Sequence, residues 1–311
     1  MKKFRNYSLL AGAMLTLAFT ACSNEEIENV PLEKPVAAQV TADIDQVVTR
    51  ASGTSWEKGD AIGISCSSTH TSYTNMKYVT ASNDGNFAHE GGAASGIFFQ
   101  GTEDVSFSAY YPFTGAEGSA PGTAGVISGN TSNQANQKDF DYLYATASTS
   151  YATPIIRFTG DNIFKHKMTR LILIIETPTS DGFNAEDVKN GTYSLSGIKL
   201  EGTFNTSNGT ATAIETVTND WKITATATDA NNQRTYSMIL YPQSSSLTFA
   251  AVINNQTYSV VIDPALAAST SYTYTITVKK AGLEVSNCTI QGWGDEITGN
   301  GTATMPASKV N

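Results

Sequence analysis

Residues 272–278 read YTYTITV, and this alternation of large apolar side chains with threonines decides the fold class. Successive side chains of an extended strand point to opposite faces, so a period of two puts the apolar residues together on one face. The same period recurs in 105–111, 221–227, 236–240, 247–253 and 258–262. Helical spacing is scarce, with one short turn expected over 184–189. We therefore predict an all-β chain built of antiparallel strands.

Composition and turn residues extend this prediction. Only 15% of the residues are charged, and Thr, Ser, Asn and Gly abound, as is typical of antiparallel sandwiches with many turns. The run 171–175 is apolar on both faces and predicts a central strand. Asn254-Asn255 predicts a tight hairpin, because asparagine tolerates left-handed backbone. The Gly/Ser-rich stretch 114–131 is expected to be a surface loop, and 176–182 is the best candidate domain boundary.

The first residues have the order of an export signal. Lys2, Lys3 and Arg5 precede the apolar run 9–19, which is too short to remain as a membrane span. Thr20-Ala21-Cys22 resembles the lipobox of bacterial lipoproteins, which implies a signal peptide over 1–21 and a lipidated Cys22. An ordinary cleaved signal with a chance cysteine is the alternative. The following tether, 22–35, is acidic at residues 25, 26 and 28, which resembles the surface-export signals of Bacteroides-group lipoproteins and implies display on the cell outer membrane.

The net charge of the chain indicates which partners it repels electrostatically. The chain has a formal net charge of −9; without residues 1–21 it keeps 16 basic and 28 acidic residues, a net charge of −12. Such a surface repels nucleic acid and anionic lipid headgroups, so neither is expected as a partner. Attachment to a membrane is expected through lipid alone.

The sequence offers little for catalysis. His70, His89 and His166 are far apart, and no HExxH, CxxC, GxSxG, GxGxxG or P-loop pattern occurs. We predict no catalytic residues, no metal site and no cofactor. Cys66 and Cys288 are expected to be buried small hydrophobic residues rather than a disulfide framework.

Several segments in order resemble the fimbrillin family, the subunits of type V pili. WEKGDAIGI at 56–64 resembles the family's W-x-x-G-D-x-I-G motif, and FKHKMTRL at 164–171 resembles its F-x-H-x-x-x-x-L strand. Tyr241-Pro242-Gln243 is similar to its Pro-Gln turn, and 272–276 followed by IQGW at 290–293 resembles its closing strand and terminal I-x-x-W. The chain departs from the pattern at 267–270, where a Gly-Lys pair is usual.

The resemblance implies two transthyretin-like antiparallel β-sandwich domains in tandem, which we place at 36–177 and 178–311. It also implies a lipidated precursor that an arginine-specific protease matures. Arg50 fits that step, since it stands alone in a polar segment just before Trp56, so the mature chain would begin at Ala51.

A candidate assembly strand precedes Arg50. Its alternating positions are Val36, Ala38, Val40, Ala42 and Ile44, which predict a strand with one apolar face. Removal of 36–50 would expose a sheet edge and an apolar groove, which a strand from a neighbouring subunit would repair head-to-tail. The tail offers Ala303, Met305 and Ala307 in alternation, interrupted by Pro306. Whether the tail donates this strand stays open.

The sequence leaves several functions open. As a pilus subunit, the chain could act at the stalk, the tip or the membrane anchor. The rival is a lipoprotein tethered at Cys22 that binds glycans or another host or bacterial surface ligand through exposed aromatic rings. A secreted hydrolase has no support from any residue.

Overall fold

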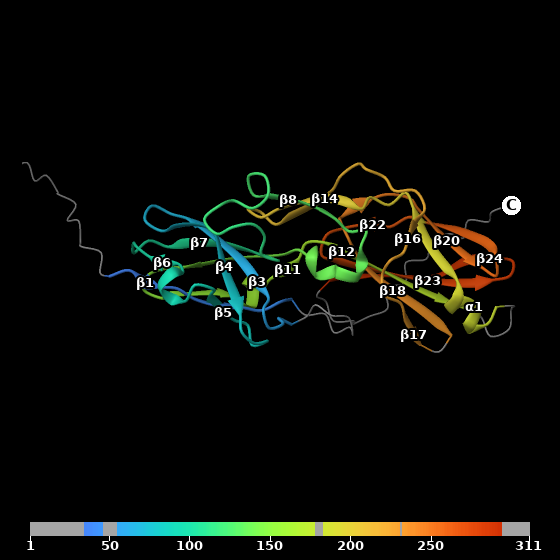
Figure 1. Cartoon of the computed structure of the whole chain (residues 1–311), viewed down its shortest axis with the longest axis horizontal. Helices are drawn as coiled ribbons and strands as arrows, with labels where there is room; N and C mark the ends of the chain where they lie inside the picture. The colour runs from blue at the N-terminus through green and yellow to red at the C-terminus, as the bar shows by residue number, and fades with distance from the viewer. Residues whose placement is uncertain (1–33, 46–54, 178–182, 231, 294–311) are drawn as a thin grey trace, which may run out of the picture. The chain divides into compact units, whose positions relative to one another are not determined.

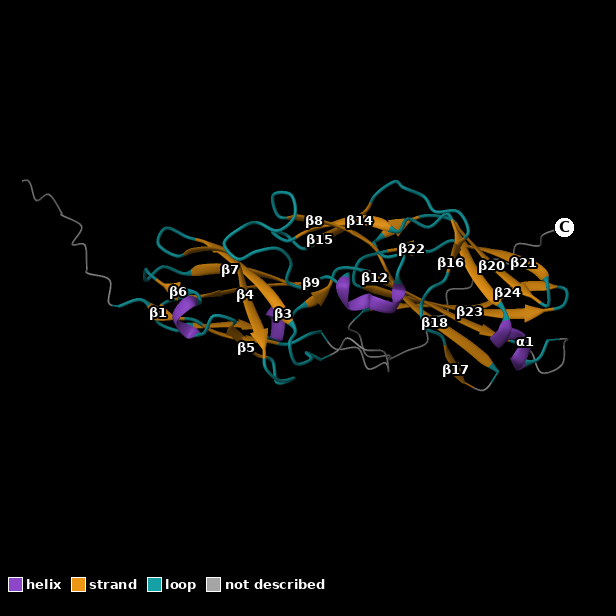
Figure 2. Cartoon of the chain, viewed as in Figure 1, coloured by secondary structure: helices purple, strands orange, loops and turns teal. Residues whose placement is uncertain are grey.

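The computed structural model describes residues 34–45, 55–177, 183–230 and 232–293, which belong to one compact unit beginning at Lys34. Strands dominate and the helices are short (Figure 2), so the all-β prediction is confirmed. None of the described helices is long and apolar enough to cross a membrane. The predicted signal peptide, Cys22, the Arg50–Ala51 cleavage site and the tail after Trp293 lie outside the described residues.

In the described part of the chain, eleven strands precede residue 169: β1 (Val36–Ala37), β2 (Gln39–Ala42), β3 (Ala61–Ser67), β4 (Ser72–Thr80), β5 (Asn86–His89), β6 (Phe98–Phe99), β7 (Val105–Tyr111), β8 (Val126–Asn130), β9 (Leu143–Thr149), β10 (Ile155–Phe158) and β11 (Lys165–His166). Eight of them form one sheet in the order β10-β2-β5-β4-β3-β7-β9-β11, while β1 pairs with β6. Only the β10–β2 pair of the large sheet is parallel.

The N-terminal half has its own apolar core, formed by one face of this sheet. Along β7, Val105, Phe107 and Ala109 are at most 1% exposed, and the serines between them face outward. Across the sheet, Ile64 lies opposite Ala109. The predicted period of two over 105–111 is thus confirmed, because each inward residue packs into the same core.

Thirteen strands follow among the residues described up to Trp293: β12 (Thr169–Glu176), β13 (Thr192–Ser196), β14 (Glu201–Asn205), β15 (Thr210–Ala213), β16 (Trp221–Lys222), β17 (Thr228–Ala230), β18 (Gln233–Leu240), β19 (Gln243–Ser244), β20 (Leu247–Ile253), β21 (Gln256–Ile262), β22 (Ala265–Leu266), β23 (Thr270–Lys279) and β24 (Gly282–Gly292). Two main sheets, β17-β18-β12-β23-β24 and β16-β13-β20-β21, contribute side chains to a second core, and β19 pairs with β22.

Three sequence predictions for this half are confirmed. The 171–175 run is the middle strand of the five-stranded sheet, and the inward residues of 272–278 are at most 4% exposed. Asn254 and Asn255 have φ of 51° and 63° at the β20–β21 hairpin. The predicted boundary after residue 177 placed β12 in the N-terminal domain, but β12 pairs on both sides with strands of the C-terminal half.

A third, small sheet joins the two halves in the order β15-β14-β8. β8 lies beside β14 (Figure 1), and its presence shows that the loop predicted over 114–131 was wrong for 126–130. The glycine at 129 is needed here, since a Cβ on it would lie 2.6 Å from the Tyr241 hydroxyl. A third cluster lies under this sheet, where the Tyr142 and Phe204 rings stack at 4.5 Å.

The short helices are η1 (Ala93–Ser95), η2 (Gln134–Asp139), η3 (Gly160–Asn162) and α1 (Ala185–Asn190). The turn expected over 184–189 is α1. It begins with a capping box, in which the Asn184 side chain accepts the Asp187 N–H and the Asp187 carboxylate accepts the Asn184 N–H.

Candidate functional site

The predicted removable strand lies inside the large sheet of the N-terminal half. Val40, Ala42 and Ile44 are 3%, 0% and 6% exposed and belong to the N-terminal core. Ala38 is half-buried against the same core, and Val36 is half-buried at the start of β1. The strand is broken at Ala38, where the backbone N–H turns to the Ile97 carbonyl at 2.8 Å.

Two neighbouring strands, β5 and β10, flank this strand and form the two walls of the space that it fills. On one side β2 runs antiparallel to β5, with Val40 opposite Phe87 and Thr41 opposite Asn86. On the other side it runs parallel to β10, with Val40 opposite Ile156. Within the described residues, β2 is the one strand that β10 pairs with. Loss of β2 would therefore leave two unpaired edges facing each other across a gap one strand wide.

Backbone hydrogen bonds run along both walls. The N–H groups of Gln39 and Asp43 donate to the Pro154 and Phe158 carbonyls, each at 2.9 Å. The Ala42 N–H donates to the Gly85 carbonyl at 2.8 Å. Gly85 has φ of 73°, and a Cβ there would lie 2.5 Å from the Ala42 oxygen. A glycine is therefore required at this point of close approach.

Trp56 packs against the strand near its end at Ala42. Its indole Nε1 donates to the Ala42 carbonyl at 2.7 Å, and its ring meets Phe87 and Phe164 edge-on at 5.0 and 5.3 Å. The strand ends beside Phe164, whose N–H donates to the Asp43 carbonyl and whose carbonyl accepts the Asp45 N–H. We call the space bounded by β5, β10, Trp56 and Phe164 the groove.

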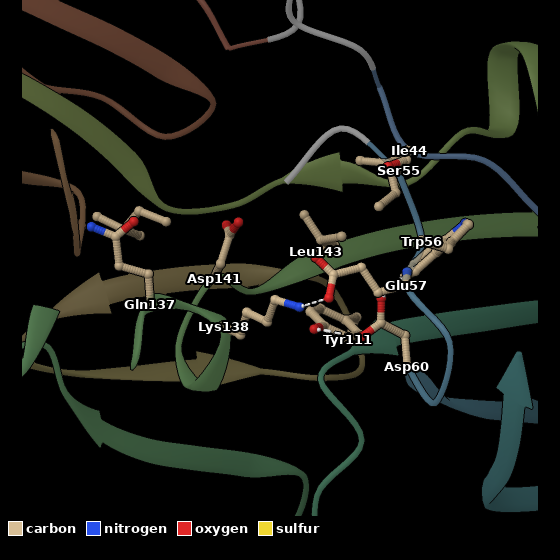
Figure 3. A pocket seen from close by; sticks show the side chains of 11 residues that line it. Ile44, Ser55, Trp56, Glu57, Asp60, Tyr111, Gln137, Lys138, Asp141 and Leu143 are labelled. Atoms are coloured by element: carbon tan, nitrogen blue, oxygen red, sulfur yellow. Dashed lines mark hydrogen bonds and ion pairs between the residues drawn. The ribbon is translucent and has the colours of Figure 1, made fainter. Parts of the chain in front are cut away.

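A small cavity of about 40 Å³ adjoins the end of the groove, between the residues that flank 46–54 (Figure 3). Ile44, which precedes the segment 46–54, lines this cavity, and so do Ser55 and Trp56, which follow the segment. Glu57 pairs with Lys138 at its edge, as the dashed line in Figure 3 shows. The cavity has room for water but falls far below the volume of a small-molecule site.

The three histidines make separate contacts within the fold and do not come together as a catalytic site. Each pairs with a different carboxylate: His70 with Glu103, His89 with Glu117 and His166 with Asp141. Hydrogen bonds, first from the Ser68 hydroxyl and then from backbone N–H groups including that of His70, lower the pKa of Glu103 to about 2. Among the described residues, no cluster of three or more His, Cys, Asp or Glu side chains could hold a metal ion.

Cys66 and Cys288 are both buried, and neither takes part in a disulfide. Burial raises the pKa of the Cys66 thiol to about 11, so the thiol stays protonated and unreactive. They behave as the small hydrophobic residues that the sequence predicted.

Comparison with known proteins bears on the role of this arrangement. A family model described as fimbrillin-like matches residues 49–293. This chain belongs to the fimbrillin-like family. It is 29% identical to a candidate fimbrium subunit, Fim1C of Bacteroides uniformis, over 95% of this chain and 99% of that one.

Two solved structures resemble the fimbrillin-like chain over most of its length. A candidate cell adhesion protein from Bacteroides ovatus superposes with a TM-score of 0.70 at 26% identity, covering 84% of this chain and 99% of that chain. Another from Bacteroides uniformis superposes with a TM-score of 0.65 at 25% identity, covering 83% and 99%. The family is one of surface-fibre and adhesion proteins, not an enzyme family.

Two motifs of the fimbrillin-like chain meet in space, which sequence reasoning did not foresee. His166 of the F-x-H motif stacks on Trp293 of the terminal motif, with ring centroids 4.0 Å apart. The guanidinium carbon of Arg170 lies over the same indole, 5.4 Å from the ring centroid. The Trp293 N–H donates to the Ser269 carbonyl at 2.6 Å. Trp293, the last described residue, is thus held by ring contacts with His166 and Arg170 and by a backbone hydrogen bond to Ser269.

Proposed function

We propose that the fimbrillin-like chain is a pilus subunit that is exported as a lipoprotein through Cys22, is cut after Arg50 and polymerises head-to-tail by β-strand exchange. Its partners are then other pilin subunits, an arginine-specific protease, and the outer membrane through lipid before cleavage. The protein is then displayed at the cell surface, first on the outer membrane and, after cleavage, in the pilus.

One observation supports this proposal: a strand upstream of Arg50, residues 39–44, fills a core groove, and no other strand among the described residues pairs in that gap. Burial of Val40 and Ile44 contributes about 1.5–3 kcal/mol each. The Trp56 indole N–H would also lose the Ala42 carbonyl, and an unsatisfied buried donor costs about 1–3 kcal/mol. A subunit without 36–50 therefore has a strong tendency to take up another strand.

The test is the N-terminus and intact mass of the protein from membrane and sheared surface fractions. We expect a chain that begins at Ala51 in high-molecular-weight sheared material, and a chain that begins at lipidated Cys22 in membranes. An Arg50→Ala variant should accumulate as the lipidated form without filaments, and Arg50→Lys tests whether the protease requires arginine. Filaments built from chains that retain 36–50 would refute the proposal.

A second candidate, a tethered glycan-binding lipoprotein, has one favourable observation. A hollow of about 610 Å³ lies over the outer face of β3, β7 and β9, and hydroxyls in register across the strands line it, among them Ser65, Ser108 and Thr146. The aromatic platform that this function was expected to use is missing from the described residues, where every aromatic side chain is buried or half-buried. Saturable binding to a neutral polysaccharide by the uncut chain would support this role, and a broad glycan panel without binding would exclude it.

A further inference from the structure

The chain that fills the groove is bonded, at its far end, to a segment that leads directly to Trp293. Phe164 makes these bonds: its N–H donates to the Asp43 carbonyl at 3.0 Å, and its carbonyl accepts the Asp45 N–H at 2.8 Å. One residue separates Phe164 from His166, whose ring stacks on the Trp293 indole. The contacts of the groove and those of Trp293 therefore lie at the two ends of a segment of three residues.

This segment, residues 164–166, is called the linking segment below, and its conformation is extended. Lys165 and His166 form β11, which pairs with Tyr144 and Leu143 of β9. At a rise of about 3.3 Å per residue, its first and last Cα atoms are about 7 Å apart. A short, hydrogen-bonded strand passes a displacement along its axis, whereas a loop of the same length would absorb it.

Phe164 depends on the groove being filled. Its side chain is fully buried, and both of its backbone hydrogen-bonding groups are bonded to the chain in the groove. The Trp56 ring, which meets Phe164 at 5.3 Å, depends on the same chain through its bond to the Ala42 carbonyl. Because a buried backbone group without a partner is strongly disfavoured, Phe164 must move to find water or another partner when the groove is empty.

The other end of the linking segment holds Trp293. The His166 ring is 1% exposed and lies 4.0 Å from the indole in a nearly parallel stack. Its Nδ1 donates to the Asp141 carboxylate at 2.8 Å, whereas its Nε2 has no hydrogen-bond partner among the described residues. The backbone is linked as well, because the His166 carbonyl accepts the Ser269 hydroxyl and the Ser269 carbonyl accepts the Trp293 N–H. A displacement of His166 therefore disturbs both the ring and the backbone contacts of Trp293.

We propose that the linking segment couples the groove to Trp293, so that the contacts of Trp293 are complete only while a strand fills the groove. This inference rests on the proposed function, in which the groove is empty between cleavage and strand exchange. A cut subunit then holds the end of β24 loosely, and the entry of a neighbour's strand fixes that end in place. Each subunit thus becomes rigid at Trp293 only after its own groove has been filled.

Fluorine NMR of the full, uncut chain labelled with 5-fluorotryptophan tests the coupling. The three tryptophans report on separate places: Trp56 beside the groove, Trp221 in the C-terminal core, and Trp293. Asp45→Pro removes the N–H that donates to the Phe164 carbonyl. It should move the Trp293 resonance toward its position in the unfolded chain, while the Trp221 resonance stays in place.

The matched control is Gln39→Pro. It also removes one backbone bond of the strand, the bond to the Pro154 carbonyl, but at the opposite end of β2 from Phe164. The Trp293 resonance should keep its wild-type position in this variant.

Coupling between two sites is reciprocal, so a second measurement runs in the opposite direction. Trp293→Leu removes the stack on His166 and keeps an apolar side chain. It should accelerate hydrogen exchange of the Asp45 amide by about 5-fold or more. Trp221→Leu makes the same change in the C-terminal core and should leave that exchange rate unaltered.

Two results of the NMR experiment would overturn the inference. One is an unchanged Trp293 resonance in Asp45→Pro; the other is an equal shift in Gln39→Pro, since the effect would then not pass through Phe164. If Asp45→Pro fails to fold, which a displaced Trp221 resonance reveals, the exchange measurement decides, and equal Asp45 rates in the two leucine variants overturn the coupling. These outcomes do not depend on cleavage, whereas failure of the proposed function appears as filaments that retain 36–50.

Discussion

Replacement of Gly85 by alanine should loosen the strand Gln39–Ala42 in its groove. Gly85 has φ of 73°, and an added Cβ would lie 2.5 Å from the Ala42 carbonyl oxygen. Left-handed backbone costs a non-glycine residue about 1–2 kcal/mol, and the overlap with the backbone of the strand adds about 1–3 kcal/mol, because a packed core resists overfilling. Gly85→Ala should therefore lower the free energy of unfolding of the uncut chain by about 2–5 kcal/mol. Urea titration of the uncut chain measures this change.

The same change at Gly59 separates the backbone cost from the contact with the strand. Gly59 has φ of 93°, and an added Cβ there meets no atom within 4 Å. Gly59→Ala therefore carries the backbone cost alone, about 1–2 kcal/mol. Equal losses of unfolding free energy in the two variants would refute the close approach of Gly85 to the strand.

Three further predictions concern the uncut chain. Ile44→Ala should lower the free energy of unfolding by about 2–4 kcal/mol because it empties a core position, whereas the exposed Gln39→Ala should change it by less than about 0.5 kcal/mol; urea titrations measure both. Trp56→Phe removes the indole donor to the Ala42 carbonyl and should cost about 1 kcal/mol beyond its loss of volume, and an unchanged urea midpoint would contradict the assigned bond. Because the pKa of Glu103 is lowered to about 2, its contribution is complete above pH 4.5 and is lost as the pH falls toward 2, so Glu103→Gln should reduce the acid sensitivity of the urea midpoint in that window.

Local patterns predicted the parts of the fold whose signals are local. The alternation at 272–278 and the apolar run at 171–175 correspond to β23 and β12, because one face or both faces of those strands are buried. The strand at 126–130 was missed because ISGN is a weak strand sequence, and only its pairing with β14 makes it extended. The boundary after 177 failed for β12 for the same reason: which sheet a strand joins depends on partners far along the chain.

The sequence predicted one part of the candidate site, the strand 36–44, and missed its partners in space. The apolar face of 36–44 could be read from its alternation, and its burial is now described. The parallel wall formed by β10 could not, since Ile155 is more than a hundred residues away from the strand it pairs with. The His166–Trp293 stack joins two motifs that each looked self-contained in sequence. Cys22 and Arg50 lie outside the described residues and remain predictions.

The placement of β2 between two walls has a mechanical consequence. In a filament built by strand exchange, a strand from a neighbouring subunit would take the place of β2, and tension would enter each groove along the axis of that strand. The backbone bonds to Pro154, Phe158 and Gly85 then share the load at once instead of opening one after another. Forced separation is governed by the barrier to unfolding rather than by equilibrium stability. The joint between subunits would then resist flow for much longer than its equilibrium affinity suggests.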